Sequence, residues 1–541
     1  MAEQRTWKWA DDPNLNKMEL TKLEKDGLDV IETIINTYSK EGFASIEASD
    51  MDRFKWAGVY QQRPKDGHFM MRVRIPGGIL SSQQARALAA IAKDYGRDLV
   101  DVTTRQAVQF HWLTVESLAD IFERLAAVGL SSFEACGDCP RTIMGNPLAG
   151  IDPHEVIDTR PIVKELERFF LLNREFSNLP RKYKMSISAN VYNAAHAQIN
   201  DLAFTPAKKV IDGEELIGFH VWVGGGLSAK PYLAQQLDVF VRPEEVVKVA
   251  AGVTTIFRDF GYRQKRTHAR LKFLVADWGV EKFREELVKV TGDLETKGED
   301  LLKGWNAGYF YGIHEQRQKG YYYAGLSVPV GRMNADELDE LARLADEYGD
   351  GTIGTCNTQN VLIRHIPAEK VEAFQAEPIV VNRFKLKPNT FIGYAVSCTG
   401  IEYCNLAIVE TKERMRSLAE YLDQTVELDT PVRIHMVGCP NSCGQRQIAD
   451  IGLQGALVKT PGGMVEAFDV HVGGTLADAR FNKKLNARVT VDKLGPFLAQ
   501  LMTLYREKRL EGEEYWQYVE RVGVDAIQAQ VDEILASAAG A

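Results

Sequence analysis

The chain has 541 residues, of which 45% are hydrophobic and 26% charged, and its formal net charge is -9. This length exceeds one ordinary hydrophobic core and predicts about three or four domains. The net negative charge argues against a bulk attraction to nucleic acid, and no apolar run reaches the roughly 18–20 residues of a membrane span. The first residues lack the apolar stretch of a secretion signal, and an odd cysteine number, 7, is typical of a reducing compartment. We therefore expect a cytoplasmic protein without a nucleic-acid or membrane partner.

The predicted elements begin with an amphipathic helix over residues 19–40, inside an N-terminal extension of residues 1–65. Apolar and polar residues alternate near the end of residues 69–76, which predicts a strand. Ser81 or Ser82 is typical of the N-cap of a following helix, which we expect to end near residue 96. Residues 99–112 indicate a strand, a turn and a second strand. The last part of the chain, residues 510–541, predicts surface and one helix, without chemistry.

The same pattern returns in the second half of the chain. Pro76 and Gln106 recur as Pro329 and Gln359, both 253 residues later. Further on, the segments 199–202 and 223–225 recur 249 residues later. Two long copies are typical of a fused duplication with a pseudo-twofold axis, because solenoid repeats are only about 20–50 residues long. Alternating strands and helices in each copy predict an α+β fold, and the junction of two such halves often holds a ligand.

Four cysteines form two pairs in the second copy, Cys398-x5-Cys404 and Cys439-x3-Cys443. Thiolates are soft ligands, and a set of four suits either a zinc ion or a 4Fe-4S cluster. Zinc sites usually have two to four residues between paired ligands, so the first gap favours the cluster. Four unrelated buried thiols are the remaining alternative.

These cysteine strings, with Cys-Pro-Asn-Ser-Cys-Gly-Gln in the second, resemble the nitrite and sulfite reductases that contain sirohaem. The resemblance implies that the four cysteines hold a 4Fe-4S cluster and that Cys443 also bridges to the sirohaem iron. It further implies two ferredoxin-like half-domains, 66–145 and 319–375, in one pseudo-symmetric domain. Two larger mixed lobes, 146–318 for sirohaem and 376–541 for the cluster, complete the expected organisation. The resemblance covers roughly residues 55–510.

The resemblance also implies a set of cations around the substrate. Four positions match the family's distal basic residues: Arg72, Arg141, Lys182 and Lys184. Such cations would bind the oxygens of a small oxyanion, and lysine could also release a proton. A lone Lys or Arg is usually a solvated surface group, but Lys182 and Lys184 would share a face if their segment is extended.

Sirohaem, as the resemblance implies, carries eight carboxylates, which would need many cationic partners when buried. The candidates are Thr103, Arg105, Gln109 and Arg181. The basic run 263–272 is a further candidate, although a solvated helix face or a nucleic-acid patch would explain it equally well. Two other cysteines, Cys136 and Cys139, are interpreted as reduced residues of the pocket wall, without a defined role.

The substrate is only weakly indicated. Lys184 is the residue of sulfite reductases, where nitrite reductases commonly have Asn. The string Cys-Pro-Asn-Ser-Cys-Gly-Gln and residues 145–153 and 199–204 look more like ferredoxin-dependent nitrite reductases, which gives a slight preference for nitrite.

No Gly-x-Gly-x-x-Gly or Walker A loop indicates a bound dinucleotide or nucleotide, so electrons would come from reduced ferredoxin or from a separate flavoprotein reductase. We predict a monomeric six-electron reductase of nitrite to ammonia or sulfite to sulfide. A sulfite reductase haemoprotein fed by a flavoprotein, a monooxygenase-like relative in corrin synthesis and a non-catalytic iron-sulfur or zinc protein are the alternatives.

Overall fold

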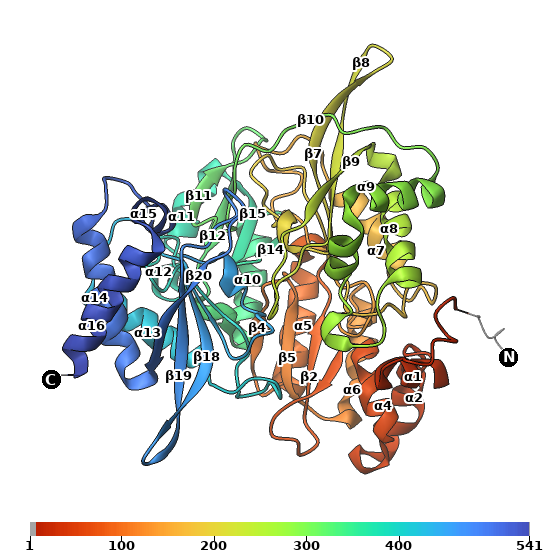
Figure 1. Cartoon of the computed structure of the whole chain (residues 1–541), viewed down its shortest axis with the longest axis horizontal. Coiled ribbons are helices and arrows are strands. Elements are labelled where there is room, and N and C mark those ends of the chain that lie inside the picture. The colour runs from red at the N-terminus through yellow and green to blue at the C-terminus, as the bar shows by residue number, and fades with distance from the viewer. Residues whose placement is uncertain (1–6, 540–541) are drawn as a thin grey trace.

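The computed structural model describes residues 7–539 and has two lobes at opposite sides of the molecule, with two sheets between them (Figure 1). Residues 1–6 of the expected N-terminal extension lie outside the described part of the chain. Within residues 7–539, none of the helices combines the length and the apolar character needed to cross a membrane. Helices and sheets of both parallel and antiparallel strands occur throughout, so the predicted α+β class is confirmed.

The N-terminal segment consists of short helical pieces, so the prediction of a single helix over residues 19–40 is wrong. The pieces are α1 (Lys17–Glu24), α2 (Asp29–Thr33), η1 (Ile34–Tyr38), α3 (Ser39–Glu41), η2 (Phe43–Ser45), α4 (Ala48–Arg53) and η3 (Phe54–Ala57). The helix is interrupted around Gly27, where a Cβ atom would lie 2.3 Å from the ring of Trp56. Only glycine permits that approach, and the chain turns there to bring α2 against the core.

The two central sheets exchange strands between the two copies of the repeat. The first sheet has the order β1-β2-β5-β4-β13 and the second has the order β11-β12-β15-β14-β3. Strand β13 of the second copy therefore completes the sheet of the first, and β3 of the first copy completes the sheet of the second. Each sheet depends on residues from both halves of the chain.

The first copy contains β1 (Val59–Gln61), β2 (Phe69–Val73), η4 (Pro76–Gly78), β3 (Ile79–Ser81), α5 (Ser82–Tyr95), β4 (Val100–Val102), β5 (Val108–Leu113), η5 (Val115–Ser117) and α6 (Leu118–Ala127). The second contains β11 (Gly312–Glu315), β12 (Tyr321–Leu326), η9 (Pro329–Gly331), β13 (Arg332–Met333), α10 (Ala335–Tyr348), β14 (Thr352–Thr355), β15 (Val361–Pro367), η10 (Ala368–Lys370), α11 (Val371–Gln375) and α12 (Pro378–Asn382). Helices α5 and α10 begin and end 253 residues apart, and a capping box starts each of them. The predicted repeat is thus present in three dimensions.

Gln106 fixes the junction between the first central sheet and the first lobe. Its backbone has a φ of 63°, and its buried side chain donates to the Gly145 carbonyl at 2.9 Å and accepts from the Gly145 N–H at 3.0 Å. Gln359 has a φ of 69° and repeats the arrangement, accepting from the N–H of Ser397 at 2.9 Å. The equivalent glutamines therefore join each sheet to a lobe.

Gln106→Ala is expected to lower the stability of the protein, because both polar groups of Gly145 lose their buried partner. The expected loss is about 1–3 kcal/mol of unfolding free energy for each unsatisfied group. The decrease in melting temperature measures it, with Gln500→Ala on an exposed helix surface as the control. Equal melting temperatures for the two variants would contradict this role of Gln106.

The first lobe is built on β7 and β8, two ten-residue antiparallel strands. Its elements are α7 (Arg160–Phe170), β6 (Met185–Ile187), η6 (Ala197–Ile199), β7 (Leu202–Ile211), β8 (Glu214–Val223), β9 (Gln235–Val241), η7 (Pro243–Glu245), α8 (Val246–Phe260), η8 (Arg266–His268), α9 (Leu271–Thr291) and β10 (Glu299–Asp300). An apolar core lies between the sheet and helices α7, α8 and α9.

The second lobe repeats this plan, with β18 and β19 in place of β7 and β8. Its elements are β16 (Ala395–Ser397), α13 (Lys412–Thr425), β17 (Ile434–Val437), η11 (Arg446–Ile448), β18 (Ile451–Thr460), β19 (Gly463–Val472), β20 (Lys483–Thr490), α14 (Val491–Lys508), α15 (Tyr515–Val522) and α16 (Val524–Ala539). The helix expected near the end of the chain is α16. The domain limits expected from the sequence stay a prediction.

Each copy also reaches across to the lobe of the other. The Thr104 hydroxyl donates to the Cys443 carbonyl at 2.7 Å, and the Asn357 side chain donates to the Ala194 carbonyl at 3.1 Å. Thr104 and Asn357 are 253 residues apart, and Ala194 and Cys443 are 249 apart. The pseudo-twofold relation therefore extends to single hydrogen bonds, and one of them holds the second cysteine loop.

Candidate functional site

The two cysteine pairs lie at one edge of the second lobe's sheet. Strands β16 and β17 are parallel neighbours, with Ser397 opposite Met436, and a cysteine loop follows each of them. The carboxyl ends of parallel strands meet at the same edge, so the two loops lie together. Gly438 allows their close contact, since a Cβ there would lie 2.7 Å from the Cβ of Ala407. The topology of the sheet thus brings together pairs that are 34 residues apart in the sequence.

The four thiols form one group. Cys398, Cys404 and Cys439 are partly buried, and Cys443 is exposed. Burial raises the pKa of each of the first three, to about 12 for Cys398, and the nearby charge of Cys443 raises it further. Within the described residues, no three His, Cys, Asp or Glu side chains are placed to hold one metal ion. The effect of the Cys443 charge on the other three thiols places all four in one neighbourhood.

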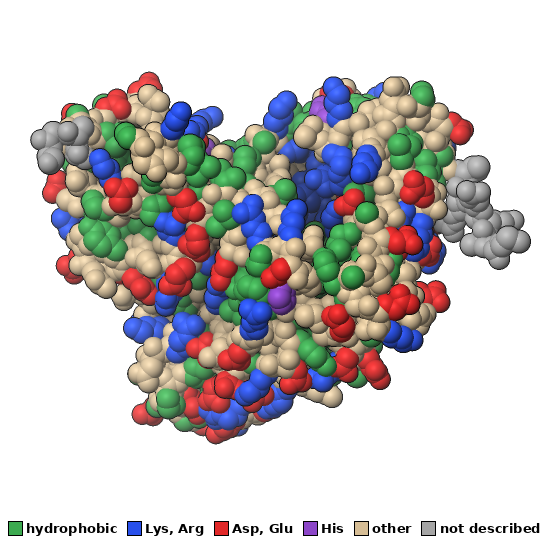
Figure 2. Space-filling view, turned by 90° about the horizontal axis from the view of Figure 1, so that it is seen from below, with side chains coloured by type: hydrophobic (Ala, Val, Ile, Leu, Met, Phe, Trp, Pro, Cys, Tyr) green, Lys and Arg blue, Asp and Glu red, His purple; other side chains and the backbone are tan. Residues whose placement is uncertain are grey.

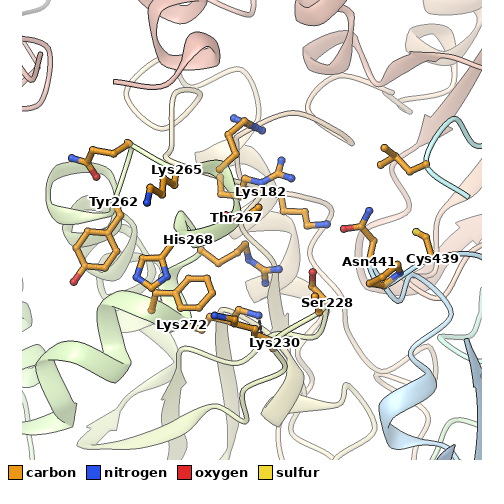
Figure 3. Close-up of a pocket in the computed structure, with 18 of the residues that line it drawn as sticks. Lys182, Ser228, Lys230, Tyr262, Lys265, Thr267, His268, Lys272, Cys439 and Asn441 are labelled. Carbon is orange, nitrogen blue, oxygen red and sulfur yellow. Dashed lines mark hydrogen bonds between the residues drawn. The ribbon is translucent and has the colours of Figure 1, made fainter. Parts of the chain in front are cut away.

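A large cavity opens between the first lobe and the second cysteine loop. Its volume is about 950 Å³. Figure 3 shows Tyr262, Lys265 and His268 on one side and Cys439 and Asn441 on the other. Lys and Arg side chains gather in a hollow of the surface in Figure 2. Seven of the lining residues are Lys or Arg, whereas Asp277 is the single acidic residue among the described residues that line it. An anionic ligand is expected in such a cavity.

The basic run 263–272 forms much of this wall. Arg263, Arg270 and Lys272 are buried, whereas Gln264, Lys265, Thr267 and His268 are exposed, so the run is only partly solvated. Arg270 donates to both oxygens of Asp201, at 3.0 and 2.8 Å. The Lys272 ammonium donates to the Leu227 carbonyl at 2.8 Å, and burial lowers its pKa to about 7. Residues 264–268, Arg270 and Lys272 line the cavity, and the binding of a cofactor by this run stays a prediction.

Lys182 and Lys184 share one face of an extended segment, as their spacing predicts. Tyr183 between them is buried in the core of the first lobe and forms a β-bridge with Pro140, so both lysines lie on the opposite face. Burial lowers the pKa of Lys182 to about 8 and that of Lys184 well below its usual value, and the neighbouring cations add to this effect. The charge of Cys443 acts on both in the opposite direction, which places them near the cysteine loop.

Arg72 and Gln109 connect the first central sheet to the cysteine loops. Arg72 on β2 donates to the Gln109 side-chain oxygen at 2.8 Å, while its Nε atom is buried without a partner among the described residues. The Gln109 amide donates to the Thr399 hydroxyl at 3.1 Å, next to Cys398. Gln109 is therefore hydrogen-bonded to the loop that carries Cys398 and Cys404, and it is not among the described residues that line the cavity.

Arg105, which is half-buried, and Arg141, which is buried, are further cations of this region. Arg105 donates to Asn200 at 2.9 Å, and burial together with the Arg141 charge lowers its pKa to about 9. The Arg141 guanidinium donates to the carbonyls of Ala135 and Gly137 in its own loop, at 2.7–3.1 Å. Arg141 therefore contributes charge, with several of its donors already used. Arg105 and Arg141 are not among the described residues that line the cavity, and neither are Arg72 and Lys184.

Thr103 and Arg181, the remaining candidates, differ in position. The Thr103 hydroxyl accepts from the N–H groups of Arg105 and Ala107, at 3.3 and 3.2 Å, and so stabilises its own turn. Its neighbour Thr104 is the residue that reaches the cysteine loop, which the sequence did not indicate because adjacent threonines look alike. Arg181 lines the cavity next to Lys182.

Cys136 and Cys139 lie in the wall next to Arg141. Both are buried, and the Cys139 thiol donates to the Cys136 carbonyl at 2.8 Å. Tyr60 lies close to Cys136 and is half-buried, and desolvation raises the pKa of its hydroxyl above the usual range. These residues pack against the Arg141 loop. Asp138 escaped sequence reasoning, and it forms an ion pair at 2.7 Å with Arg266 of the basic run.

The whole region has an excess of positive charge. Neighbouring cations lower one another's pKa values: that of Arg105 is lowered by Arg141, Arg72 and Arg270, and that of Lys184 by Arg105 and Lys182. Two of the guanidinium groups keep a buried Nε atom without a partner among the described residues. Buried cations of this kind fit a ligand with several carboxylates, together with a thiolate site at its edge.

Comparison with known proteins gives a consistent result. The family described as nitrite and sulphite reductase 4Fe-4S domain matches residues 136–293 and 392–538. The nitrite/sulfite reductase ferredoxin-like half domain matches residues 60–128 and 314–380. These two families together account for both copies of the repeat.

Individual relatives carry both substrate names. The ferredoxin–nitrite reductase of Synechococcus elongatus is 41% identical over 91% of this chain and 97% of its own length. Sulfite reductase [ferredoxin] 2 of Mycolicibacterium paratuberculosis is 38% identical over 96% of this chain and 98% of its own. The solved structure of the NirA protein of Mycobacterium tuberculosis has a TM-score of 0.90 and 37% identity, covering 95% of this chain and 97% of that one.

Proposed function

Because the chain belongs to the nitrite and sulfite reductase family, whose members bind sirohaem and a 4Fe-4S cluster, we propose that it reduces nitrite to ammonia with six electrons. Reduction of sulfite to sulfide is the second candidate, favoured by Lys184. The observation that carries the proposal is the excess of buried and half-buried cations near the exposed Cys443 thiol. A polycarboxylate cofactor next to a thiolate-bound cluster fits this arrangement of charges.

The cavity residues would hold the carboxylates of the cofactor. Arg181, Lys182 and Arg266 line the cavity, with Lys272 at its wall. Arg105 lies behind them and can contribute through its charge. Thr103 stabilises the turn that carries Arg105 and Thr104, so its part in holding the cofactor is indirect.

Four thiolates, from Cys398, Cys404, Cys439 and Cys443, would hold the cluster, and Cys443 would be shared with the sirohaem iron. When bound, the two cofactors supply single electrons and an iron atom that can hold a small oxyanion. Gln109 and Thr104 fix the two cysteine loops from the first copy, at the Thr399 hydroxyl and the Cys443 carbonyl. Residues of both copies thus determine the position of the cluster.

The distal cations would act on the substrate itself. Arg72 and Arg141 keep their charge and would stabilise the negative oxygens of nitrite. Lys182, whose pKa burial lowers to about 8, is suited to hold a proton and release it at the substrate. Lys184 lies on the same face and would perform the same part for a second oxygen.

Two measurements on the purified protein test the proposed function. An absorption spectrum of the loaded protein should contain the bands of sirohaem, and turnover with reduced ferredoxin should be faster with nitrite than with sulfite. Protein that carries the cluster but no tetrapyrrole would instead support a non-catalytic electron-transfer protein. Faster turnover of sulfite would move the assignment to the second candidate.

Lys184→Asn is expected to lower sulfite turnover by about 10-fold or more while nitrite turnover changes little, because the doubly charged sulfite gains more from a second lysine. Steady-state rates with both substrates, measured on the same preparation, give the ratio. Sulfite turnover equal to that of the wild type would show that Lys184 does not select the substrate.

The proposed electron donor is reduced ferredoxin, with a separate flavoprotein as the alternative. Arg63 lies beside the cluster loop, donating to the Asn405 carbonyl at 3.4 Å, and its charge acts on Cys404. Because ferredoxins are typically acidic, the KM for ferredoxin is expected to rise with added salt, and Arg63→Ala should reduce this dependence. A KM for ferredoxin that is insensitive to salt would contradict electrostatic docking.

A further inference from the structure

The N-terminal helix α1 inserts two charged residues into the first lobe. Glu19 and Lys22 are both buried and pair with each other at 2.7 Å. Glu19 also pairs with Arg263 at 2.5 Å, and Lys22 donates to the Leu179 carbonyl at 2.9 Å. Neither family comparison reaches this helix, because their matches begin at residue 60. Buried ion pairs of this kind cost desolvation energy and call for an explanation beyond packing.

The second partner of Lys22 leads to the cavity. Its ammonium lies 3.5 Å from the carboxylate of Asp138, which is itself buried. Arg266 donates to both oxygens of this carboxylate, at 2.7 and 3.0 Å, whereas Arg181 approaches only to 3.6 Å. Burial alone would raise the pKa of Asp138, but Lys22 and the two arginines hold it below its usual range. One carboxylate is therefore shared by three cations.

Of Lys22, Arg266 and Arg181, the last lies farthest from the Asp138 carboxylate. Its side chain is 29% exposed and lines the cavity, and it makes no hydrogen bond to another described residue through its guanidinium group. If Lys22 lost its charge, the carboxylate would attract Arg181 more strongly and draw it away from the cavity. The charge on Lys22 thus controls how much of the Arg181 charge a ligand in the cavity can use.

We propose that Lys22 is a positioning residue of the cofactor pocket, which keeps Arg181 available to the carboxylates of sirohaem by sharing Asp138 with it. This inference rests on the proposed function of the cavity. It gives the N-terminal extension a part in cofactor retention, although none of its described residues, 7–65, lines the cavity. The loop that carries Arg266 is held by the same extension, since Trp9 packs on Arg263 at 3.7 Å.

The test compares variants of the loaded enzyme. Lys22→Met is expected to lose sirohaem about tenfold faster in high salt, the effect of weakening one charge-assisted hydrogen bond, whereas Lys22→Arg should behave as the wild type. The readout is the sirohaem absorbance retained per chain after gel filtration. Turnover per bound sirohaem should stay unchanged, because Lys22 does not touch the substrate. Lys25→Met is the matched control, since Lys25 follows the same helix but pairs with Asp50 at 3.0 Å.

A charge-compensated variant separates positioning from packing. Lys22→Met with Asp138→Asn restores the balance of charge, and sirohaem retention should return toward that of the wild type. Retention no better than in Lys22→Met would show that the helix acts only by packing, and Lys22→Met equal to Lys25→Met would also overturn the proposal. If Lys22→Met does not fold, Asp138→Asn alone decides: it should retain sirohaem at least as well as the wild type, and faster loss would contradict the proposal. A wild-type protein without sirohaem would instead refute the proposed function.

Discussion

Cys443→Ser is expected to reduce nitrite turnover by more than about 100-fold, because even outer partners of metal ligands cost about 10–100-fold when removed. The serine hydroxyl is a poor ligand for iron, and Cys443 is the thiol whose charge reaches the other three thiols and both distal lysines. Iron and acid-labile sulfide per chain, the absorption spectrum and the turnover rate together measure the effect.

Cys356→Ala is the matched control for this substitution. Cys356 is fully buried in an apolar cluster with Leu148 and Phe310, and burial raises the pKa of its thiol above the usual range. This variant should keep the cluster, the spectrum and the turnover rate at the cost of some stability. Full activity in Cys443→Ser would rule out the shared thiolate.

Lys182→Met is expected to lower turnover by about 100- to 1,000-fold, the usual effect of removing one donor to a developing negative charge. The side chain lines the cavity next to Arg181 and carries the lowered pKa of about 8 that suits proton transfer. The cluster should remain, because Lys182 is not one of its four proposed cysteine ligands. Turnover at saturating nitrite and the spectrum of the oxidised protein measure the two effects separately.

The control for Lys182→Met is Lys209→Met, in the same lobe. Lys209 lies near the end of β7 and donates to the Thr296 hydroxyl at 3.0 Å, away from the cavity. This variant should keep the wild-type rate. Equal turnover rates for Lys182→Met and Lys209→Met would show that Lys182 does not act on the substrate.

Much of this architecture could be predicted from sequence, because the decisive signals are local or periodic. Cysteine spacing indicated a soft metal site, and the 253-residue offset is matched by helices α5 and α10. The capping residue Ser81 and the strand, turn and strand of residues 99–112 follow from short-range rules. The side-by-side placement of Lys182 and Lys184 needed only strand geometry.

Other features depend on contacts between distant residues and left no signal in the sequence. The break near Gly27 arises from the Trp56 ring, and a pattern of leucines cannot show that obstacle. The choice of Thr104 over Thr103 depends on where the Cys443 carbonyl lies. The link from Lys22 to Asp138 joins residues more than one hundred positions apart. Surface charge and buried charge look the same in a sequence.

The repeat also shows how one centre arises from two copies. Lys184 is equivalent to Arg433, 249 residues later, and Asp201 to Asp450. In the second copy Arg433 donates to both oxygens of Asp450, at 2.9 and 2.8 Å. In the first copy Arg270 takes that place on Asp201, which leaves the Lys184 side chain to face the cysteine loop.

The strand exchange between the central sheets has a consequence for biosynthesis. Strand β4 needs β13 as its edge partner, and Asp101 and Arg332 are separated by 231 residues. At a synthesis rate of about 5–20 residues per second, the nascent first sheet waits about 10–50 s for its last strand. The cysteine loops leave the ribosome later still. Cofactor insertion must therefore follow the synthesis of Cys443, and the edge of the first sheet stays incomplete until Arg332 and Met333 have been made.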